Sequence, residues 1–366
     1  KSVPGVGNHL FKRLIDRFGA PEKVLAASRA ELLSVPGISE PVVSAIRSCK
    51  TPDGIDKVLD TCARKAISVI TLTDPDYPAL LREIPDPPPY LYIMGRLAPD
   101  AACVSVVGSR SPTRYGLSMA TQLSGDLAAA GLCVVSGMAR GIDTAAHAGA
   151  LDAGGTTWAV LGSGLARIYP PENEKLARRI IEKGALISEF PLSAGPDAHH
   201  FPVRNRVISG LSLGTVVVEA AGRSGSLITA RLAMEQGREV FAVPGSIQSF
   251  KSTGAHNLLK QGATLVEKAS DVLAEISHRM AGATLPAAGP TEKQAGPKTR
   301  FEKVSPSLDT DEVRVLQTLE PYPVHIDEIA RRLSLAPGKT AALLLQLELK
   351  GLVIQEPGKR FLLKGD

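Results

Sequence analysis

The chain has 366 residues, enough for two or three domains that each bury a core of their own. Its apolar content of 44% and charged content of 22% are ordinary for a globular protein, and no apolar run is long enough to span a membrane. The net charge of +5 fits a nucleic-acid partner. The aromatic content of 4% argues against a long stacking surface for single strands, so recognition has to rely on charge and backbone contacts.

The four cysteines form no CxxC pair. Cys103 and Cys133 lie in expected strands, where cysteine usually acts as a small apolar filler. No signal-peptide pattern is present. We therefore expect a cytoplasmic protein with neither a zinc nor a disulfide framework.

Residues 1–48 contain one short pattern twice. Val3-Pro4-Gly5-Val6-Gly7 and Val35-Pro36-Gly37-Ile38 each precede an amphipathic run. Such a turn between short helices resembles the helix-hairpin-helix motif, whose hairpin amides bind a DNA phosphate. The alternative is a helical module that only packs against its neighbour, and the second copy has Ser39 in place of the second glycine. We expect a helical, SAM-like domain over residues 1–64.

Residues 65–277 alternate between strand and helix patterns, which predicts an α/β domain with a mostly parallel, Rossmann-like sheet and helices on both faces. The segment from about 49 to 100 is interpreted as a connection between domains that carries the first two strands. Strands are expected near 66–72, 90–94, 102–107, 132–135, 156–161, 185–188, 214–219, 239–243 and 264–266. Helices are expected near 115–130, 141–153, 173–183, 226–236 and 254–261.

Residues 278–308 are rich in Ala, Gly, Pro, Lys and Thr without apolar periodicity, which predicts a flexible linker. Residues 309–366 show three helix patterns followed by two short strand patterns, which is typical of a winged-helix domain. Its third helix, near 337–350, carries few polar groups. A winged helix that contacts protein, or is merely structural, is therefore at least as well favoured as a reader of the major groove.

Small residues and arginines follow several of the expected strands. Ligands of parallel sheets bind beyond the C-terminal ends of the strands, where glycine lets the backbone approach a ligand and serine adds a small donor. We predict a phosphate-binding edge there. The turn residues assigned to it are Gly108, Ser109, Arg110, Ser136, Gly137, Arg140, Gly225 and Ser226.

The stretch from 200 to 237 concentrates the same chemistry. We expect Phe201-Pro202-Val203-Arg204-Asn205-Arg206 to form a basic loop before a strand covered on both faces. Gly222-Arg223-Ser224-Gly225-Ser226 then turns into a helix, whose free N–H groups favour an anion. The alternative for each arginine is an ion pair within the domain. Glu189 and Glu219, at strand ends, are expected to orient arginines or cap loops.

Other chemistries fit less well. The turn after Gly108 lacks the G-x-G-x-x-G fingerprint, and the turn after Gly222 lacks the P-loop lysine. A hydrolase built on Ser136, Asp143 and His147 lacks a nucleophile elbow. A helix-surface hydrogen bond or a favourable interaction with the helix dipole explains both Asp143 and His147.

Metal binding is also not expected. His199 and His200 are adjacent, so their side chains do not easily face one ion, and no carboxylate cluster stands beside them. We therefore assign no catalytic residue, metal or cofactor. The nearest enzymatic alternative is a Rossmann-like nucleotide phosphoribohydrolase, but Leu227 and Ile228 stand where that class has its catalytic acid.

Taken together, the motifs of residues 65–277 resemble the DprA (Smf) family of DNA-processing proteins. The matching segments are Val106-Val107-Gly108-Ser109-Arg110, the run from Ser136 to His147, Tyr169-Pro170-Pro171-Glu172-Asn173, Ser188-Glu189-Phe190-Pro191, Phe201 to Gly210, Ser224 to Ala230 and Val243-Pro244-Gly245-Ser246. The helical N-terminal region and the winged helix match the family layout. Gly254-Ala255-His256-Asn257 departs from the family's Gly-Thr-Asn or Gly-Cys-Asn by an inserted-looking His256.

The resemblance implies a protein without catalytic activity that binds and protects single-stranded DNA and loads the RecA recombinase during natural transformation. It also implies a homodimer formed through the Rossmann-like domain. The positions that carry over as DNA contacts are Arg110, Arg204, Asn205 and Arg206.

Overall fold

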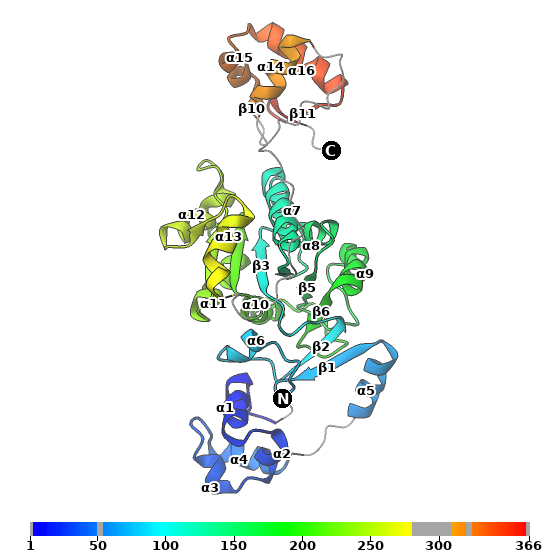
Figure 1. Ribbon diagram of the computed structural model, residues 1–366, viewed down its shortest axis with the longest axis vertical. Coiled ribbons are helices and arrows are strands. Elements are labelled where there is room, and N and C mark those ends of the chain that lie inside the picture. Colours follow the sequence, from blue (N-terminus) through cyan, green and yellow to red (C-terminus); the bar gives the residue numbers. More distant parts are fainter. Residues whose placement is uncertain (1–2, 50–53, 280–308, 320–323, 364–366) are drawn as a thin grey trace. The chain divides into compact units, whose positions relative to one another are not determined.

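The computed structural model describes residues 3–49, 54–279, 309–319 and 324–363 (Figure 1). They belong to two compact units, and the residues from 309 onward lie in the second. The predicted linker at 278–308 falls almost wholly outside the described residues. None of the described helices is long and apolar enough to cross a membrane.

A nine-stranded sheet forms the centre of the first unit, in the order β1-β2-β6-β5-β4-β3-β7-β8-β9. The seven neighbouring strands β6, β5, β4, β3, β7, β8 and β9 are parallel. At the β6 edge, β2 pairs antiparallel with β6, and β1 pairs antiparallel with β2. The segment interpreted as a connection therefore contributes two strands to the sheet itself. The bounds are β1 Ile67–Thr71, β2 Tyr90–Gly95, β3 Cys103–Gly108, β4 Cys133–Ser136, β5 Thr157–Val160, β6 Ala185–Ser188, β7 Gly214–Val218, β8 Glu239–Ala242 and β9 Thr264–Leu265.

The helices of this unit connect and cover the strands. Their bounds are α5 Ile55–Arg64, α6 Ala79–Glu83, α7 Arg114–Ala129, α8 Ile142–Asp152, α9 Glu174–Lys183, α10 His200–Gly210, α11 Gly225–Glu235, α12 Thr253–Lys260 and α13 Ala269–Ile276, with short 3-10 turns at Pro171–Asn173, Phe250–Ser252 and Ser277–Arg279. The predicted strands and helices of residues 65–277 are confirmed within a few residues. The helices α6, α10 and α13 were not predicted.

Two cores lie on opposite faces of the sheet, because successive side chains of a strand point to opposite sides. In β5 and the residue after it, Trp158 and Val160 pack in the core that contains residues of α10, α11 and α12. Ala159 and Leu161 pack in the core that contains residues of α8 and α9. This arrangement confirms the predicted doubly covered sheet.

The segment expected as a basic loop is helical. Residues 201–206 lie in α10, and Pro202 stands in its first turn, where a missing N–H is tolerated. Arg204, Asn205 and Arg206 are buried, so this helix presents polar side chains where an apolar stripe is normal. The sequence of α10 therefore lacks the apolar periodicity from which a helix is predicted.

The segment that departs from the family pattern lies in the helix that was expected near 254–261. Gly254-Ala255-His256-Asn257 lies in α12, and His256 pairs through Nε2 with the carbonyl of Gly245 at 3.0 Å. Gly254 faces a crowded site, since a Cβ there would approach the carbonyl oxygen of Ala220 to 2.6 Å. His256, the residue that departs from the family pattern, thus has a hydrogen-bond partner within the domain.

The N-terminal residues form short helices, α1 Asn8–Phe18, α2 Pro21–Ala26, α3 Arg29–Leu33 and α4 Glu40–Arg47. The two predicted Pro-Gly turns place Gly5 and Gly37 at φ values of 82° and 90°, a region that favours glycine. Leu14, Leu32 and Val43 are part of a separate small core. The predicted helical module is confirmed.

The second unit contains α14 Thr310–Thr318, β10 Val324–His325, α15 Ile326–Leu333, α16 Pro337–Leu349, β11 Val353–Glu356 and β12 Arg360–Leu363. Its strands pair in the order β10-β12-β11. Three helices and an antiparallel wing confirm the predicted winged-helix fold. The third helix, α16, exposes Leu345 and Leu349.

Candidate nucleic-acid interface

A pocket of about 790 Å³ opens at the C-terminal ends of β3 and β7. These adjacent strands are where the order of the sheet reverses, since β4 follows β3 on one side and β8 follows β7 on the other. Loops diverge at such a point and leave a crevice, which is the usual binding place in doubly wound sheets. The pocket therefore lies at the edge of the sheet where the sequence predicted phosphate binding.

The structure brings most of the predicted site residues together in this pocket. Those that line it are Gly108, Ser109, Arg110, Arg204, Asn205, Gly225 and Ser226. Four others, Ser136, Gly137, Arg140 and Arg206, are not part of its wall. Each of the four has a structural explanation.

The exposed cations of the pocket are Arg110 and Arg223. Neither forms an ion pair with any carboxylate among the residues that the structure describes. The guanidinium of Arg110 lies 5.3 Å from the ring centroid of Phe201, within the range of a cation–π contact. Both arginines thus have donors to offer to an anionic ligand.

Arg204 plays a different part from Arg110. It is only 4% exposed, and its Nη1 donates to the carbonyls of Gly137, at 2.5 Å, and Val160. Burial, opposed by Asp143 and reinforced by Arg110, lowers the pKa of Arg204 to about 10. Arg204 therefore stays charged at neutral pH and contributes positive potential from the floor of the pocket.

The hydrolase arrangement of Ser136, Asp143 and His147 is not assembled. Ser136 Oγ donates to the carbonyl of Val106 at 2.6 Å, and Asp143 Oδ2 accepts N–H groups of the Ser136–Ala139 turn. His147 Nδ1 instead pairs with the hydroxyl of Thr157 at 2.7 Å.

Burial explains the protonation behaviour of the two ionisable groups of this set. Burial raises the pKa of Asp143, while the charge of Arg204 and the backbone donors act in the opposite direction. Burial, helped by the charge of Arg204, lowers the pKa of His147 to about 3. His147 is consequently neutral at physiological pH and belongs to the core.

Arg206 is 5% exposed and points away from the pocket. Its Nη2 lies 2.7 Å from Glu189 Oε2, and its Nε lies 2.9 Å from Asp86 Oδ2. Burial raises the pKa of Asp86, against the charge of Arg206. The alternative of an intradomain ion pair holds for Arg206, and the prediction that Glu189 orients an arginine is confirmed.

Arg140 is exposed and forms an ion pair with Glu172, outside the pocket. This contact lowers the pKa of Glu172 and raises that of Arg140.

The glycines after the strands make room for side chains of the protein itself. A Cβ at Gly137 would lie 2.5 Å from Arg204 Nη1, and one at Gly162 would lie 2.8 Å from the ring of Phe201. At Gly108 it would meet the carbonyl of Val218 at 1.9 Å. These glycines therefore shape the pocket by internal packing, whereas the sequence suggested a close approach to the ligand.

The N-terminus of α11 completes the pocket. Ser224 is its N-cap and accepts a hydrogen bond from the N–H of Ser226, and the two hydroxyls lie 2.7 Å apart. Asn205 ties α10 to this turn, since its Nδ2 donates to the carbonyl of Gly225 at 3.3 Å. An eleven-residue helix with its N-terminal amides at the pocket is suited to hold an anion.

Two aromatic residues of the pocket were not predicted as site residues. Tyr169 is 41% exposed, and its ring centroid lies 6.0 Å from that of Phe201. Both line the pocket. Both lie within segments that carry the family resemblance, but the site residues were chosen from charged and small polar residues, so the two aromatic residues were missed.

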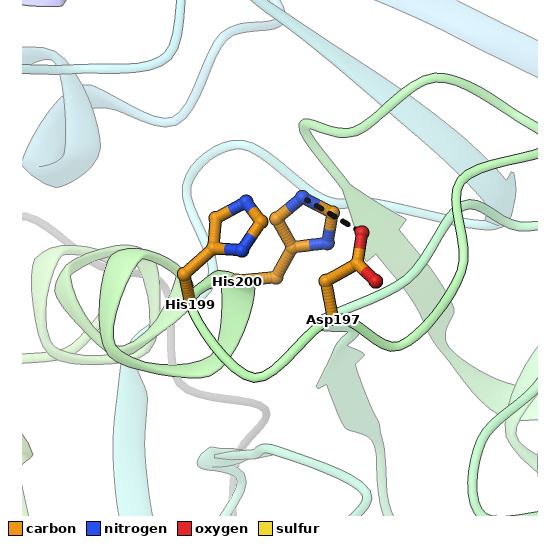
Figure 2. A group of neighbouring side chains, drawn as sticks. All are labelled: Asp197, His199 and His200. Atoms are coloured by element: carbon orange, nitrogen blue, oxygen red, sulfur yellow. Dashed lines mark ion pairs between the residues drawn. The ribbon is translucent and has the colours of Figure 1, made fainter.

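The prediction about the adjacent histidines needs a correction. Asp197 lies beside His199 and His200, and one ligand atom of each comes within 4.8 Å of the others (Figure 2). The three residues flank the start of α10, where the turn brings one ligand atom of each side chain near the others. The three potential ligands therefore lie closer together than the adjacency of the two histidines suggested.

Comparison with known proteins yields consistent matches along the chain. Residues 68–277 match the family described as DNA recombination-mediator protein A, residues 300–359 the DprA winged helix domain, and residues 1–48 a SAM-like helix-hairpin-helix tandem. The Smf protein of Synechocystis is 36% identical, and the match covers 98% of this chain and 96% of the relative. The DprA protein of Streptococcus pneumoniae is 46% identical over 56% of this chain and 73% of its own.

Two solved structures resemble the chain as well. The X-ray structure of DprA from Streptococcus pneumoniae has a TM-score of 0.60 and 35% identity, and the match covers 74% of this chain and 98% of that one. A structure of DprA from Helicobacter pylori, described for its single-stranded DNA binding mode, has a TM-score of 0.53 and 28% identity over 58% of this chain and 96% of that one.

Proposed function

Because this chain belongs to the family of DNA recombination-mediator protein A, the DprA and Smf proteins, we propose that it binds single-stranded DNA at the pocket between β3 and β7. The observation that carries the proposal is the pairing of exposed, unpaired arginines with a helix N-terminus at one crevice. That combination favours a chain of phosphates over a neutral ligand.

Phosphates are the first contacts of the proposed complex. Arg110 and Arg223 offer planar guanidiniums that can bind a phosphate through two hydrogen bonds. The N-terminus of α11 at Gly225 offers a second phosphate position. Arg204 stays beneath them and adds charge without leaving its carbonyl partners.

The aromatic pair explains a preference for a single strand. Tyr169 is exposed at the pocket beside Phe201, and a base can stack on its ring only when that base is unpaired. Each stacked base contributes about 1–3 kcal/mol. A duplex keeps its bases inside and forgoes this contribution.

The family membership supports a wider proposal. In it, the protein protects incoming single-stranded DNA and loads the RecA recombinase in natural transformation, acting as a homodimer through the Rossmann-like domain and without catalysis. The proposed division of the chain is a helical domain at 1–64, the DNA-binding domain at 65–277, a linker at 278–308 and the winged helix at 309–366.

One observation favours a second candidate function. Asp143 is a buried carboxyl with a raised pKa, and it lines the same pocket. A nucleotide-hydrolysing enzyme would need such a group as its acid. Asp143 is, however, engaged by two backbone N–H groups, which suits a structural part better.

The test compares binding and hydrolysis with the same protein. Fluorescence anisotropy with a labelled oligo-dT strand and with a duplex of equal length, at two salt concentrations, measures preference and charge dependence. Release of free base from nucleoside monophosphates measures catalysis. Tight, salt-sensitive binding of the single strand without hydrolysis supports the proposal. Base release without DNA binding would refute it in favour of the enzyme.

A further inference from the structure

A cluster of three potential metal ligands lies at the rim of the pocket. Asp197 and His199 precede α10, and His200 is its first residue. Figure 2 shows their side chains projecting from this short segment, with the imidazole of His200 facing the carboxylate of Asp197. The distance between His200 Nε2 and Asp197 Oδ2 is 4.0 Å.

His200 is already oriented as a ligand. Its Nδ1 lies 3.2 Å from the carbonyl oxygen of Gly195, and because a carbonyl only accepts, Nδ1 carries the proton. The lone pair of the neutral ring is then on Nε2, the atom nearest to Asp197. The ring also stacks on Phe190, with centroids 4.0 Å apart. In metal-binding histidines, the ring nitrogen that does not bind the metal usually donates its N–H to a backbone carbonyl, a carboxylate or water.

The backbone brings the other two groups to the same point. The N–H of His200 donates to the carbonyl of Asp197 at 2.9 Å, which closes a tight turn between them. The ring of His199 lies 4.3 Å from that of His200, at an angle of 63°. Asp197 and His199 are exposed, so rotation of their side chains meets little resistance.

A small rearrangement suffices for coordination. Ligand atoms around a tetrahedral zinc ion, bound at about 2.0–2.1 Å, lie about 3.3 Å from one another. The present separations of up to 4.8 Å therefore have to shorten by at most about 1.5 Å. The half-buried His200 provides the fixed ligand, and the two exposed residues close around the ion.

We propose that Asp197, His199 and His200 form a binding site for Zn²⁺ or a similar divalent transition metal. Two imidazoles and one carboxylate suit such ions, whereas Mg²⁺ and Ca²⁺ prefer oxygen ligands alone. Three protein ligands leave at least one coordination position open. The neighbouring Pro196, Ala198 and Phe201 line the pocket, so the ion lies at its rim.

The location suggests what fills the open position. In a protein that binds single-stranded DNA at this pocket, as proposed above, a phosphate oxygen of the strand is the available ligand. The ion then adds positive charge beside Arg110, on the side of the pocket where α10 begins. This part of the inference rests on the proposed function, whereas the metal site itself does not.

Metal binding is tested first, without DNA, on the full chain free of any histidine tag. Titration with Co²⁺, followed by its visible absorption, and with Zn²⁺, followed by calorimetry, should show one ion per chain. His200→Gln and Asp197→Asn should each weaken binding by about tenfold or more, since even the loss of a supporting contact has an effect of that size. His278→Gln, at an exposed histidine outside the cluster, is the matched control.

The outcomes are distinct. Equal affinity in wild type and His200→Gln, or no binding by the wild type, would overturn the site. Loss of binding in His278→Gln as well would indicate adventitious surface binding and overturn it too. Circular dichroism of each variant separates loss of a ligand from loss of the fold.

The link to DNA is tested by oligo-dT anisotropy with Zn²⁺ and with EDTA. Zn²⁺ should tighten binding by about tenfold in the wild type, the effect of one charge-assisted contact, and leave His200→Gln unchanged. An equal effect on both proteins would overturn the phosphate contact while the metal site stands. Metal binding by a protein that binds no DNA would overturn the proposed function alone.

Discussion

Replacing Arg110 by alanine removes a guanidinium that forms no ion pair among the residues that the structure describes. Arg110 is exposed, and its described contact is the one with the ring of Phe201. The fold should therefore be retained, and the loss should appear in binding. A charge-assisted hydrogen bond contributes about 1.5–3 kcal/mol, which corresponds to about a 10- to 150-fold rise in Kd.

The salt dependence of the same variant provides a second readout. Each phosphate neutralised on a single strand contributes about 0.7 to the slope of log K against log salt concentration. Arg110→Ala should lower that slope by about this amount. Arg110→Lys should restore part of the slope but not the affinity, because an ammonium cannot reproduce the two-pronged contact.

Fluorescence anisotropy with labelled oligo-dT measures both quantities. The matched control is Arg178→Ala on α9, an exposed arginine outside the pocket. Unchanged affinity and slope in Arg110→Ala, with its fold intact by circular dichroism, would refute the phosphate contact. An equal loss in Arg178→Ala would show that only net charge matters.

Three further predictions concern the rest of the molecule. Arg206→Met should destabilise the fold by about 3–5 kcal/mol in urea unfolding, because it leaves the buried Glu189 and the half-buried Asp86 without this cation; a loss of DNA affinity at unchanged stability would contradict this. His147 has a folded-state pKa of about 3, below the ordinary value of 6.5. Between these two pH values the unfolded chain binds more protons than the folded one, so the free energy of unfolding should fall by about 2 kcal/mol from pH 6.5 to pH 5. The same pH slope in His147→Gln would disprove that assignment. Deleting residues 309–366 should change single-strand affinity by less than about tenfold, because α16 exposes Leu345 and Leu349 and its lysine, Lys339, is paired with Asp311; a larger loss would place a DNA contact in the winged helix.

The sequence by itself was sufficient wherever local pattern decides structure. The apolar runs predicted strands such as β6 and β7. Their alternation with helical segments predicted that each strand pairs in parallel with its neighbour, as β6 does with β5 and β7 with β8. The turns at Gly5 and Gly37 followed from glycine's tolerance of positive φ. These features depend on neighbours in the chain, so they can be read from the sequence.

Only the tertiary structure separated the arginines by function. Arg204 and Arg206 differ from Arg110 because of partners far away in the sequence, namely the carbonyls of Gly137 and Val160 and the carboxylates of Glu189 and Asp86. The sequence did not predict α10 either, because the helix buries these polar side chains and so lacks the apolar stripe from which a helix is predicted. Long-range burial and hydrogen bonding leave no local periodicity, so strand order and side-chain partners emerge only when the chain has folded.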